Sequence, residues 1–312
     1  PANPGWFDRD RFVLSAGHAS MLLYALLHLA GYDLTLEDIQ DFRQWGSKTP
    51  GHPERGHTPG VEMTTGPLGQ GLSHAVGMAL AEAHLAARFN RPGLPLVDHY
   101  TYVMASDGDL MEGVSAEACA LAGHLGLGKL IVLYDDNGIS LAGSTALSFT
   151  EDVSRRFEAA GWQVETVEDG NDVEAVSQAI AAARTELGKP SLLRIRTCIG
   201  FGAPTKGGTA ACHGSPLGTD ELALTKAALN WPESPAFFVP EDVRNVFRKI
   251  ASRGAASETA WNDLLERYRD TAPEQAACFE RLLRSELPEG WETSLPDFSG
   301  QEKDLSTRKA SE

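Results

Sequence analysis

The sequence predicts an α/β fold with a mainly parallel sheet between helices. Two apolar runs of strand length, His99–Ala105 (HYTYVMA) and Lys129–Tyr134 (KLIVLY), each end at a polar turn. Between them, Met111–Leu127 is rich in small residues, which is typical of a helix that packs closely on a sheet. Later in the chain, Ser191–Cys198 (SLLRIRTC) alternates as a strand does. Strands separated by a helical crossover favour parallel pairing.

Three helices and a long loop are expected before the first of these strands. Ser20–Gly31 has apolar residues at helical spacing and ends on a glycine, and Thr35–Trp45 begins with a capping-box pattern, Thr-x-x-Asp. Trp45–Gly71 is rich in Gly, Pro, Thr and His and predicts a long loop, which in a compact domain is usually functional. Gly69–Asn90 is an Ala-rich helical stretch with a glycine-rich start.

The C-terminal part of the sequence predicts mostly helix. Asp172–Glu186 is amphipathic, and Pro240–Leu287 is charged and helical with little strand signal, which makes it a helical C-terminal extension of the fold. Glu286–Leu305 carries prolines, glycines and acids and reads as a linker.

Composition excludes several classes of partner. The 312 residues contain 27 Lys and Arg against 43 Asp and Glu, a net charge of −16, so nucleic acid and anionic membranes are not expected partners. No apolar run reaches membrane-spanning length, and no signal peptide is visible. The four cysteines are scattered without metal-ligand or disulfide spacing, which predicts buried free thiols and a reducing cytoplasm: Cys119, Cys198, Cys212 and Cys278.

Oxygen-bearing side chains follow both apolar runs. Asp107 lies in the turn after the first run and Asn137 in the turn after the second. Parallel strands would bring both turns to the carboxyl edge of the sheet, where open α/β folds bind ligands. A carboxylate, an amide oxygen and a backbone carbonyl suit Mg²⁺ or Ca²⁺, and Gly108 would let a diphosphate approach the backbone. The alternative is an ordinary pair of Asp-Gly and Asn-Gly turns.

Longer stretches resemble one family. The segments SDGDLMEG and AGHLGLGKLIVLYDDNGIS resemble the thiamine diphosphate signature of the transketolase family. Other family-like stretches occur in the same order as in that family: DRDRFVLSAGHASMLLYALLHLAGYDL, SKTPGHPE, GVEMTTGPLGQGLSHAVGMA, FNRPG and IGFGAPTKGGTAACHGSPLG. The chain departs from the family at Ser106, where glycine is common.

The resemblance implies a bound thiamine diphosphate and a divalent metal, Mg²⁺ or Ca²⁺. The metal would be held by Asp107, Asn137 and the carbonyl of Ile139. Cofactor contacts are implied for Gly66, Pro67 and Leu68 at the aminopyrimidine end, for Gly108, Asn137, His18 and His213 at the diphosphate, and for Leu141 and Ile199 around the thiazolium ring. As bare residues, Leu141 and Ile199 would be plain core. Asp109, Asp135 and Asp136 are expected to be turn residues or supporting groups.

Three histidines in glycine-rich surroundings are candidate catalytic and substrate-binding residues. By resemblance, His18 and His213 contact both cofactor and substrate, and His52 holds the hydroxyl beside the reacting carbonyl. The alternative for each is a solvated loop histidine. Glu112 is implied to face the partner subunit in a proton relay, although acids in a first helical turn also stabilise the helix dipole. Arg308 is implied to bind the substrate's terminal phosphate, the alternative being an exposed charge.

The implied activity is transfer of a two-carbon ketol unit. A ketose phosphate such as xylulose 5-phosphate would donate it to an aldose phosphate such as ribose 5-phosphate, in the pentose phosphate pathway. Residues 1–285 would form the diphosphate-binding domain, and residues 286–312 a linker and the first turn of a pyrimidine-binding domain. We expect a homodimer that needs this domain from the partner subunit, and an inactive chain without it. Alternatives are the N-terminal subunit of a split transketolase, a dihydroxyacetone-synthase-like sibling and a non-catalytic cofactor-binding fragment.

Overall fold

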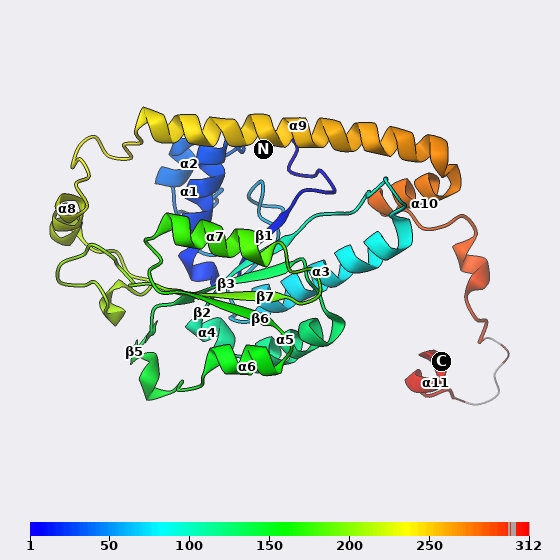
Figure 1. The fold of residues 1–312 in the computed structure, drawn as a ribbon, viewed down its shortest axis with the longest axis horizontal. Helices are drawn as coiled ribbons and strands as arrows, with labels where there is room; N and C mark the ends of the chain where they lie inside the picture. The colour runs from blue at the N-terminus through cyan, green and yellow to red at the C-terminus, as the bar shows by residue number, and fades with distance from the viewer. Residues whose placement is uncertain (299, 301–303, 312) are drawn as a thin grey trace. The chain divides into compact units, whose positions relative to one another are not determined.

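The computed structural model confirms the α/β class and the parallel sheet (Figure 1). It describes residues 1–298, 300 and 304–311, in two compact units, Pro1–Leu264 and Leu265–Glu312. The five strands of the first unit run in the order β1-β2-β3-β7-β6 and all pair in parallel. Their bounds are Arg11–Leu14 (β1), Thr101–Ser106 (β2), Leu130–Asp136 (β3), Gln163–Val167 (β6) and Ser191–Arg196 (β7). The register pairs Ser106 with Asp135, so the turns after β2 and β3 leave the sheet side by side.

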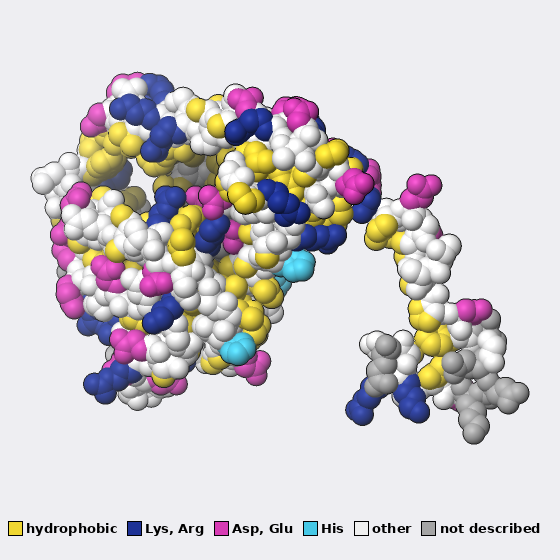
Figure 2. Space-filling view, turned by 45° about the vertical axis from the view of Figure 1, so that its right-hand side comes forward, with side chains coloured by type: hydrophobic (Ala, Val, Ile, Leu, Met, Phe, Trp, Pro, Cys, Tyr) yellow, Lys and Arg dark blue, Asp and Glu magenta, His cyan; other side chains and the backbone are white. Residues whose placement is uncertain are grey.

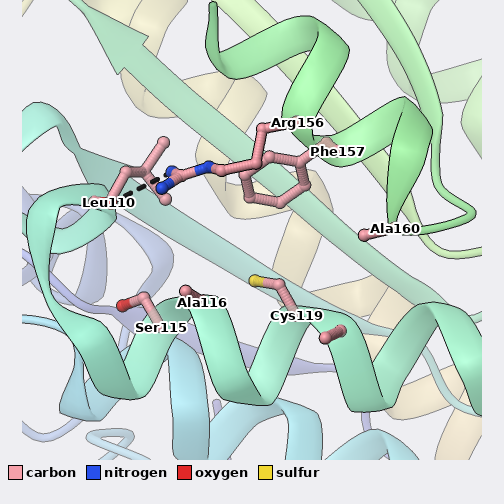
Figure 3. A pocket seen from close by; sticks show the side chains of 8 residues that line it. Leu110, Ser115, Ala116, Cys119, Arg156, Phe157 and Ala160 are labelled. Atoms are coloured by element: carbon pink, nitrogen blue, oxygen red, sulfur yellow. Dashed lines mark hydrogen bonds between the residues drawn. The ribbon is translucent and has the colours of Figure 1, made fainter. Parts of the chain in front are cut away.

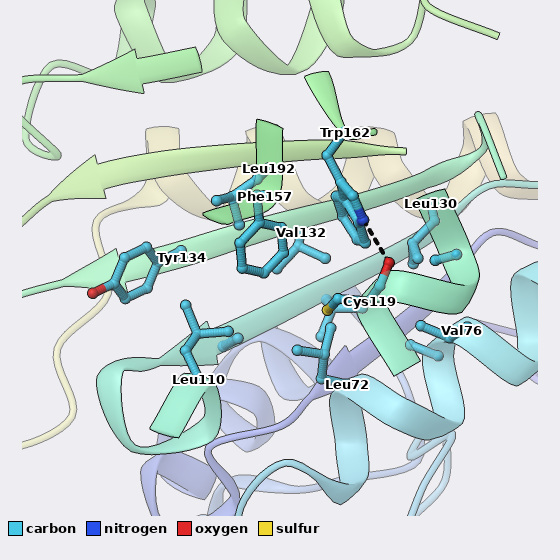
Figure 4. Packing of buried hydrophobic residues seen from close by; sticks show 14 of the residues in the cluster. Leu72, Val76, Leu110, Cys119, Leu130, Val132, Tyr134, Phe157, Trp162 and Leu192 are labelled. Atoms are coloured by element: carbon cyan, nitrogen blue, oxygen red, sulfur yellow. Dashed lines mark hydrogen bonds between the residues drawn. The ribbon is translucent and has the colours of Figure 1, made fainter. Parts of the chain in front are cut away.

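One face of the sheet carries the main hydrophobic core (Figure 4). Helices α3 (Gln70–Phe89), α5 (Gly113–Leu125) and α6 (Val153–Ala159) cover this face. Trp162 lies edge-on to Phe157, and its indole Nε1 donates to the Cys119 carbonyl at 2.8 Å. A buried indole that satisfies its N–H in this way joins α5 and α6 to the core without leaving an unpaired donor.

The opposite face is covered by α1 (Ser20–Ala30), α2 (Leu36–Gln40) and α7 (Val173–Ala183). The prediction for α1 is confirmed, because Gly31 ends it in the left-handed conformation at φ 87°. The capping box at Thr35 is also present, with Asp38 as its second member. The predicted extension of α2 to Trp45 is wrong. Arg43 is left-handed at φ 63° and its N–H donates to the Thr49 carbonyl, which turns the chain into the long loop.

The other predicted elements differ mainly in their boundaries. The helix predicted over Met111–Leu127 is α5, and a separate short helix, α4 (Asp107–Met111), precedes it and begins directly at the end of β2. Glu112 separates the two helices with an extended ψ of 135°. The predicted strand over Ser191–Cys198 is β7, two residues shorter. The sequence pattern did not indicate β1, β6, α6 or α8 (Thr219–Ala228), which are short or carry few apolar residues.

The C-terminal region is helical, as predicted. α9 (Glu241–Thr271) begins in the first unit, where the Trp261 indole donates to the Leu96 carbonyl at 2.9 Å, and it ends in the second. The second unit also contains α10 (Pro273–Leu283) and α11 (Thr307–Ser311). The predicted division at residue 285 stays a prediction, and residues 299, 301–303 and 312 of the predicted linker lie outside the described residues. The minor elements are β4 (Ile139–Ser140), β5 (Gly143–Ser144), η1 (Gly17–Ala19), η2 (Thr145–Leu147), η3 (Ala210–Cys212) and η4 (Trp291–Ser294).

Two surface features bear on function. On the face seen in Figure 2, acidic and basic side chains are interspersed and do not separate into one patch of a single sign. A small cavity of about 150 Å³ lies between α5 and α6 (Figure 3). The one charged side chain in its lining, Arg156, already has partners in the chain: it donates to the Leu110 carbonyl at 3.0 Å and forms an ion pair with Glu151 at 2.7 Å. Burial raises the pKa of the Cys119 thiol in its wall to about 12, so this cavity offers no reactive group at neutral pH.

Within the described part of the chain, none of the helices combines the length and the apolar character that crossing a membrane requires.

The close approach of α5 to the end of α6 makes a testable prediction about Gly123. A Cβ at this position would lie 1.8 Å from the Ala160 carbonyl oxygen, so Gly123→Ala must push backbone apart. We expect it to lower the free energy of unfolding by roughly 1–3 kcal/mol, the usual effect of overpacking. Gly77→Ala in α3 is the matched control, because nothing lies within 4 Å of its Cβ position. Alanine there should stabilise by up to about 1 kcal/mol. Urea unfolding of both variants measures the difference, and equal stabilities would contradict the described contact between α5 and α6.

Candidate functional site

The carboxyl edge of the sheet opens into the largest of the described cavities. It measures about 860 Å³ and lies where the turns after β1, β2, β3 and β7 converge. Of the predicted site residues, nine line it: His18, Leu68, Gly108, Glu112, Asn137, Ile139, Leu141, Ile199 and His213. Stretches from across the first unit are therefore brought to one site. Asp107 is buried and does not line the cavity, and His52, Gly66 and Pro67 do not line it either.

Asp107 is held at the first position of α4 by the end of β2. Its side chain is almost fully buried, and the Tyr134 hydroxyl donates to Oδ1 at 2.5 Å. Its second oxygen, Oδ2, has no hydrogen-bond partner among the described residues. Burial raises the pKa of this carboxyl, and the nearby Asp136 charge adds to the rise, while hydrogen bonds from Tyr134 and the Gly138 backbone N–H oppose it. A buried acceptor without a partner is costly, and either a hydrogen-bond donor or a cation would satisfy it.

Asn137 is oriented by its neighbours in the turn after β3. Its Nδ2 donates to Asp135 at 3.2 Å, and its Oδ1 accepts from the Ile139 N–H at 2.9 Å. An amide oxygen has a second lone pair, so Oδ1 remains able to bind a metal. Within the described residues, no group of three His, Cys, Asp or Glu side chains could hold a metal. A cation here would depend on one carboxylate, one amide, a carbonyl and oxygens from another molecule.

Asp136 has a different role from its neighbours. Its Oδ2 accepts from Arg194 at 2.6 Å and from Arg196 at 2.7 Å. Although burial alone would raise the pKa of Asp136, the hydrogen bonds and charges of the two arginines outweigh it and the pKa is lowered. This ion cluster fixes β3 to β7 below the site. It is a supporting group, as the sequence suggested.

The glycine-rich loop before α3 lies against the same edge. Gly66 and Gly69 both have positive φ, 152° and 77°, which favours glycine at each. The Leu68 side chain reaches the backbone of Gly108, where a Cβ would lie only 2.8 Å from Leu68 Cδ1. His52 packs beside Gly66, because a Cβ built on Gly66 would lie 3.4 Å from His52 Cδ2. The loop, the Asp107 turn and His52 are therefore close neighbours, although the sequence separates them widely.

His18 and His213 form a stacked pair in the cavity. Their ring centroids are 4.9 Å apart and the planes are inclined by 27°. Burial lowers the pKa of His18, and the charges of His213 and His52 lower it further, against an opposing effect of Asp109. A neutral imidazole can both donate and accept a hydrogen bond, so such a ring can take part in proton transfer.

The two histidines are anchored by different devices. His18 lies in η1, directly after Gly17, where a Cβ would come within 2.6 Å of Thr65 Oγ1. His213 follows η3, in a loop whose beginning is hydrogen-bonded to Glu221. The Glu221 carboxylate accepts from the backbone N–H groups of Thr205 at 2.8 Å and Lys206 at 3.0 Å.

The remaining predicted residues are placed less specifically. Glu112 is exposed at the cavity between α4 and α5, and Leu141 is 76% exposed, so it is a rim residue and not core. Ile199 is half-buried in the wall. Arg308 lies exposed in α11 of the second unit. Their predicted roles stay predictions.

The structure adds four residues to the site. Arg43 and Cys212 line the cavity, Tyr134 holds Asp107, and Asp109 is buried beneath the site and is hydrogen-bonded to Gly69. All four cysteines are free, but only Cys119 is buried, so burial was a wrong prediction for the other three. The Asp-Gly-Asp pattern after Ser106 was a visible signal for Asp109, whereas a buried tyrosine at a strand end and a loop arginine give no signal of their own.

Comparison with known proteins identifies the family of the chain. The family model described as "Transketolase, thiamine diphosphate binding domain" matches residues 1–288. The transketolases of Geobacillus stearothermophilus and Nostoc sp. are 57% and 58% identical over the whole chain, which spans 47% of the length of each.

Solved structures give the same result. Transketolase from Leishmania mexicana superposes with a TM-score of 0.93 at 53% identity, covering 96% of this chain and 44% of that one. Transketolase from Pichia stipitis, in a complex with sedoheptulose-7-phosphate, gives 0.95 at 46% identity, covering 99% and 46%. This chain belongs to the transketolase family, of which it carries the thiamine diphosphate-binding domain.

Proposed function

We propose that this chain binds thiamine diphosphate through a divalent cation, Mg²⁺ or Ca²⁺, held by Asp107, Asn137 and the Ile139 carbonyl. The observation that carries the proposal is the buried Oδ2 of Asp107, an acceptor with no partner in the described structure. Its sequence neighbours Ser106 and Gly108 line the cavity of about 860 Å³. Gly108 and the loop Gly66–Leu68 would hold the rest of the cofactor. Leu141 and Ile199 would contact its thiazolium ring.

The proposed reaction is transfer of a two-carbon ketol unit from a ketose phosphate to an aldose phosphate. The bound cofactor supplies the nucleophilic carbon and the electron sink for this chemistry. Sedoheptulose-7-phosphate, the ligand named for the Pichia stipitis relative, is a ketose phosphate and supports this substrate class. Xylulose 5-phosphate and ribose 5-phosphate are the proposed donor and acceptor, in the pentose phosphate pathway and in the cytoplasm.

The chain's own histidines would handle the substrate's protons. His18 and His213 lie face to face in the cavity, so one substrate hydroxyl could contact both rings. His52, beside Gly66, would bind the hydroxyl next to the reacting carbonyl. Arg308 would bind the terminal phosphate through a bidentate guanidinium contact.

We further propose that the complete enzyme is a homodimer. Glu112, exposed at the cavity, would face the partner subunit, whose pyrimidine-binding domain would supply the acid that hydrogen-bonds the cofactor's pyrimidine ring. The N-terminal subunit of a split transketolase and a dihydroxyacetone-synthase-like sibling share this site and differ in what completes it. A non-catalytic cofactor-binding fragment would bind the cofactor but never turn over.

Metal-coupled cofactor binding is the first test of this proposal. Asp107→Ala removes the carboxylate that would hold the cation, so calorimetry should show thiamine diphosphate affinity falling by more than about tenfold in Mg²⁺. Asp169→Asn, an exposed acid outside the cavity, is the control and should bind like the unmodified chain. Equally tight binding in excess chelator, or by Asp107→Ala, would refute the metal site.

The histidine pair predicts a low pKa for His18. The folded pKa lies below the ordinary value of 6.5, because burial and the neighbouring histidines disfavour the charged ring. The corresponding contribution to stability is therefore present above pH 6.5 and is lost as the pH falls through the folded pKa. Imidazole NMR titration measures this value, and His213→Gln should raise it. A pKa of 6.5 or higher for His18 would contradict the described packing.

Catalysis should require more than this chain. In a coupled transketolase assay with thiamine diphosphate and Mg²⁺, the 312-residue chain should give no turnover, because the acid that hydrogen-bonds the pyrimidine ring is proposed to come from the partner subunit. Among the described residues, Glu112 and Asp135 are the only carboxyl groups that line the cavity. Adding a separately produced pyrimidine-binding part should restore activity if the two associate. Multiple turnovers from the chain alone would show that no second domain is needed.

A further inference from the structure

Asp109 is a fully buried carboxylate that accepts hydrogen bonds from three separate parts of the chain. Oδ1 accepts from the Ser15 hydroxyl at 2.7 Å and from the Gly69 N–H at 2.8 Å. Oδ2 accepts from the N–H and the hydroxyl of Ser106 at 2.9 and 3.0 Å. No lysine or arginine pairs with it in the described part of the chain. Four donors converge on it, so both oxygens serve as acceptors.

These donors come from the segments that form the proposed cofactor site. Ser106 ends β2 directly before Asp107, and Gly69 follows the loop Gly66–Leu68. Ser15 follows β1, and its hydroxyl in turn accepts from the Leu72 N–H in the first turn of α3. One side chain thus joins the turn proposed for the diphosphate to the loop proposed for the pyrimidine.

Helix capping alone does not account for this arrangement. Closing the first turn of α4 needs only the contact with Ser106, three residues away. The donors to Oδ1 lie 40 and 94 residues away in the sequence, so that oxygen makes only tertiary contacts.

The backbone of Asp109 adds a second connection. Its carbonyl accepts from the Ser115 hydroxyl at 2.6 Å, and a Cβ on Gly69 would lie 2.7 Å from that same hydroxyl. Gly69 is therefore hydrogen-bonded to the Asp109 carboxylate and packs closely against Ser115. The loop cannot shift relative to the Asp107 turn without breaking buried hydrogen bonds.

We infer that Asp109 is a positioning residue, which sets the spacing between the diphosphate turn and the pyrimidine loop so that one cofactor molecule meets both at once. The inference rests on the proposed function. A ligand that spans two sites gains affinity only when their separation matches its own length. Fixing that separation before binding removes the ordering cost from the binding step.

The test compares a ligand that spans both segments with one that reaches only the turn. Asp109→Asn keeps the shape but replaces an acceptor oxygen by an NH₂ group facing donors, which displaces the loop. Calorimetry with Mg²⁺ should show about tenfold weaker binding of thiamine diphosphate, but a change within about threefold for inorganic pyrophosphate. A purely structural role would weaken both probes alike or neither.

The matched control is Glu82→Gln, another buried carboxyl, which pairs with Lys129 before the amino end of β3. It should leave both affinities unchanged. If Asp109→Asn does not fold, Ser15→Ala removes one donor to Oδ1 and should reduce thiamine diphosphate affinity about threefold, again sparing pyrophosphate.

The outcomes separate the two proposals. An unmodified chain that binds no thiamine diphosphate with Mg²⁺ overturns the proposed function and this inference with it. Normal binding by the unmodified chain, with equal losses for both probes or no loss in the variants, overturns the positioning role of Asp109 alone.

Discussion

The in-register parallel pairing of β2 and β3 is the constraint on which the site depends. Ser106 lies opposite Asp135, so the chain leaves both strands at the same level of the sheet. A shift of register by one residue would turn every side chain of β2 to the other face. The buried residues Val103 and Ala105 specify the observed register, because they point into the core between the sheet and α3. Packing on the apolar face therefore determines where the polar edge residues meet.

A second consequence of this pairing is the concentration of buried acids at one edge. Asp107, Asp109 and Asp136 are each less than one tenth exposed, and each is treated differently by its surroundings. Asp136 is neutralised by two arginines, and Asp109 accepts four hydrogen bonds from neutral donors. Only Asp107 keeps an oxygen without a partner. Three side chains of similar type therefore have three different roles, because their neighbours differ. Asp136 forms ion pairs, Asp109 connects distant segments by hydrogen bonds, and Asp107 keeps an oxygen that can accept from a ligand.

Much of this architecture was predictable from local patterns. Apolar runs identified β2 and β3, and terminal glycines and capping residues identified α1 and the start of α2, because these features act within a few residues. β1 has only four residues, and its stability comes from pairing with β2, which no local pattern encodes. The end of α2 is set by the left-handed Arg43, whose conformation depends on a contact with Thr49 across the loop.

The same distinction applies to the site. Asp107 and Asn137 could be selected as candidates because each follows its strand directly, and their metal-binding role stays a prediction. The roles of Tyr134 and Asp109 were not predicted from the sequence, because both depend on long-range contacts. Tyr134 contacts a residue 27 positions away, and Asp109 binds Ser15 across 94 positions. Long-range hydrogen bonds of buried side chains depend on the assembled sheet, and residue type alone indicates only that a partner must exist.

The open oxygen of Asp107 also links the fold to the supply of small molecules. A buried acceptor without a partner makes the ligand-free state less stable than it would be with that group satisfied. Any ligand that satisfies it binds the folded state and not the unfolded one, so it shifts the folding equilibrium by mass action. In a cell, unfolded chains are continuously removed by proteases. The steady-state amount of this protein is therefore expected to follow the concentration of any such ligand, which would make ligand availability a control on abundance.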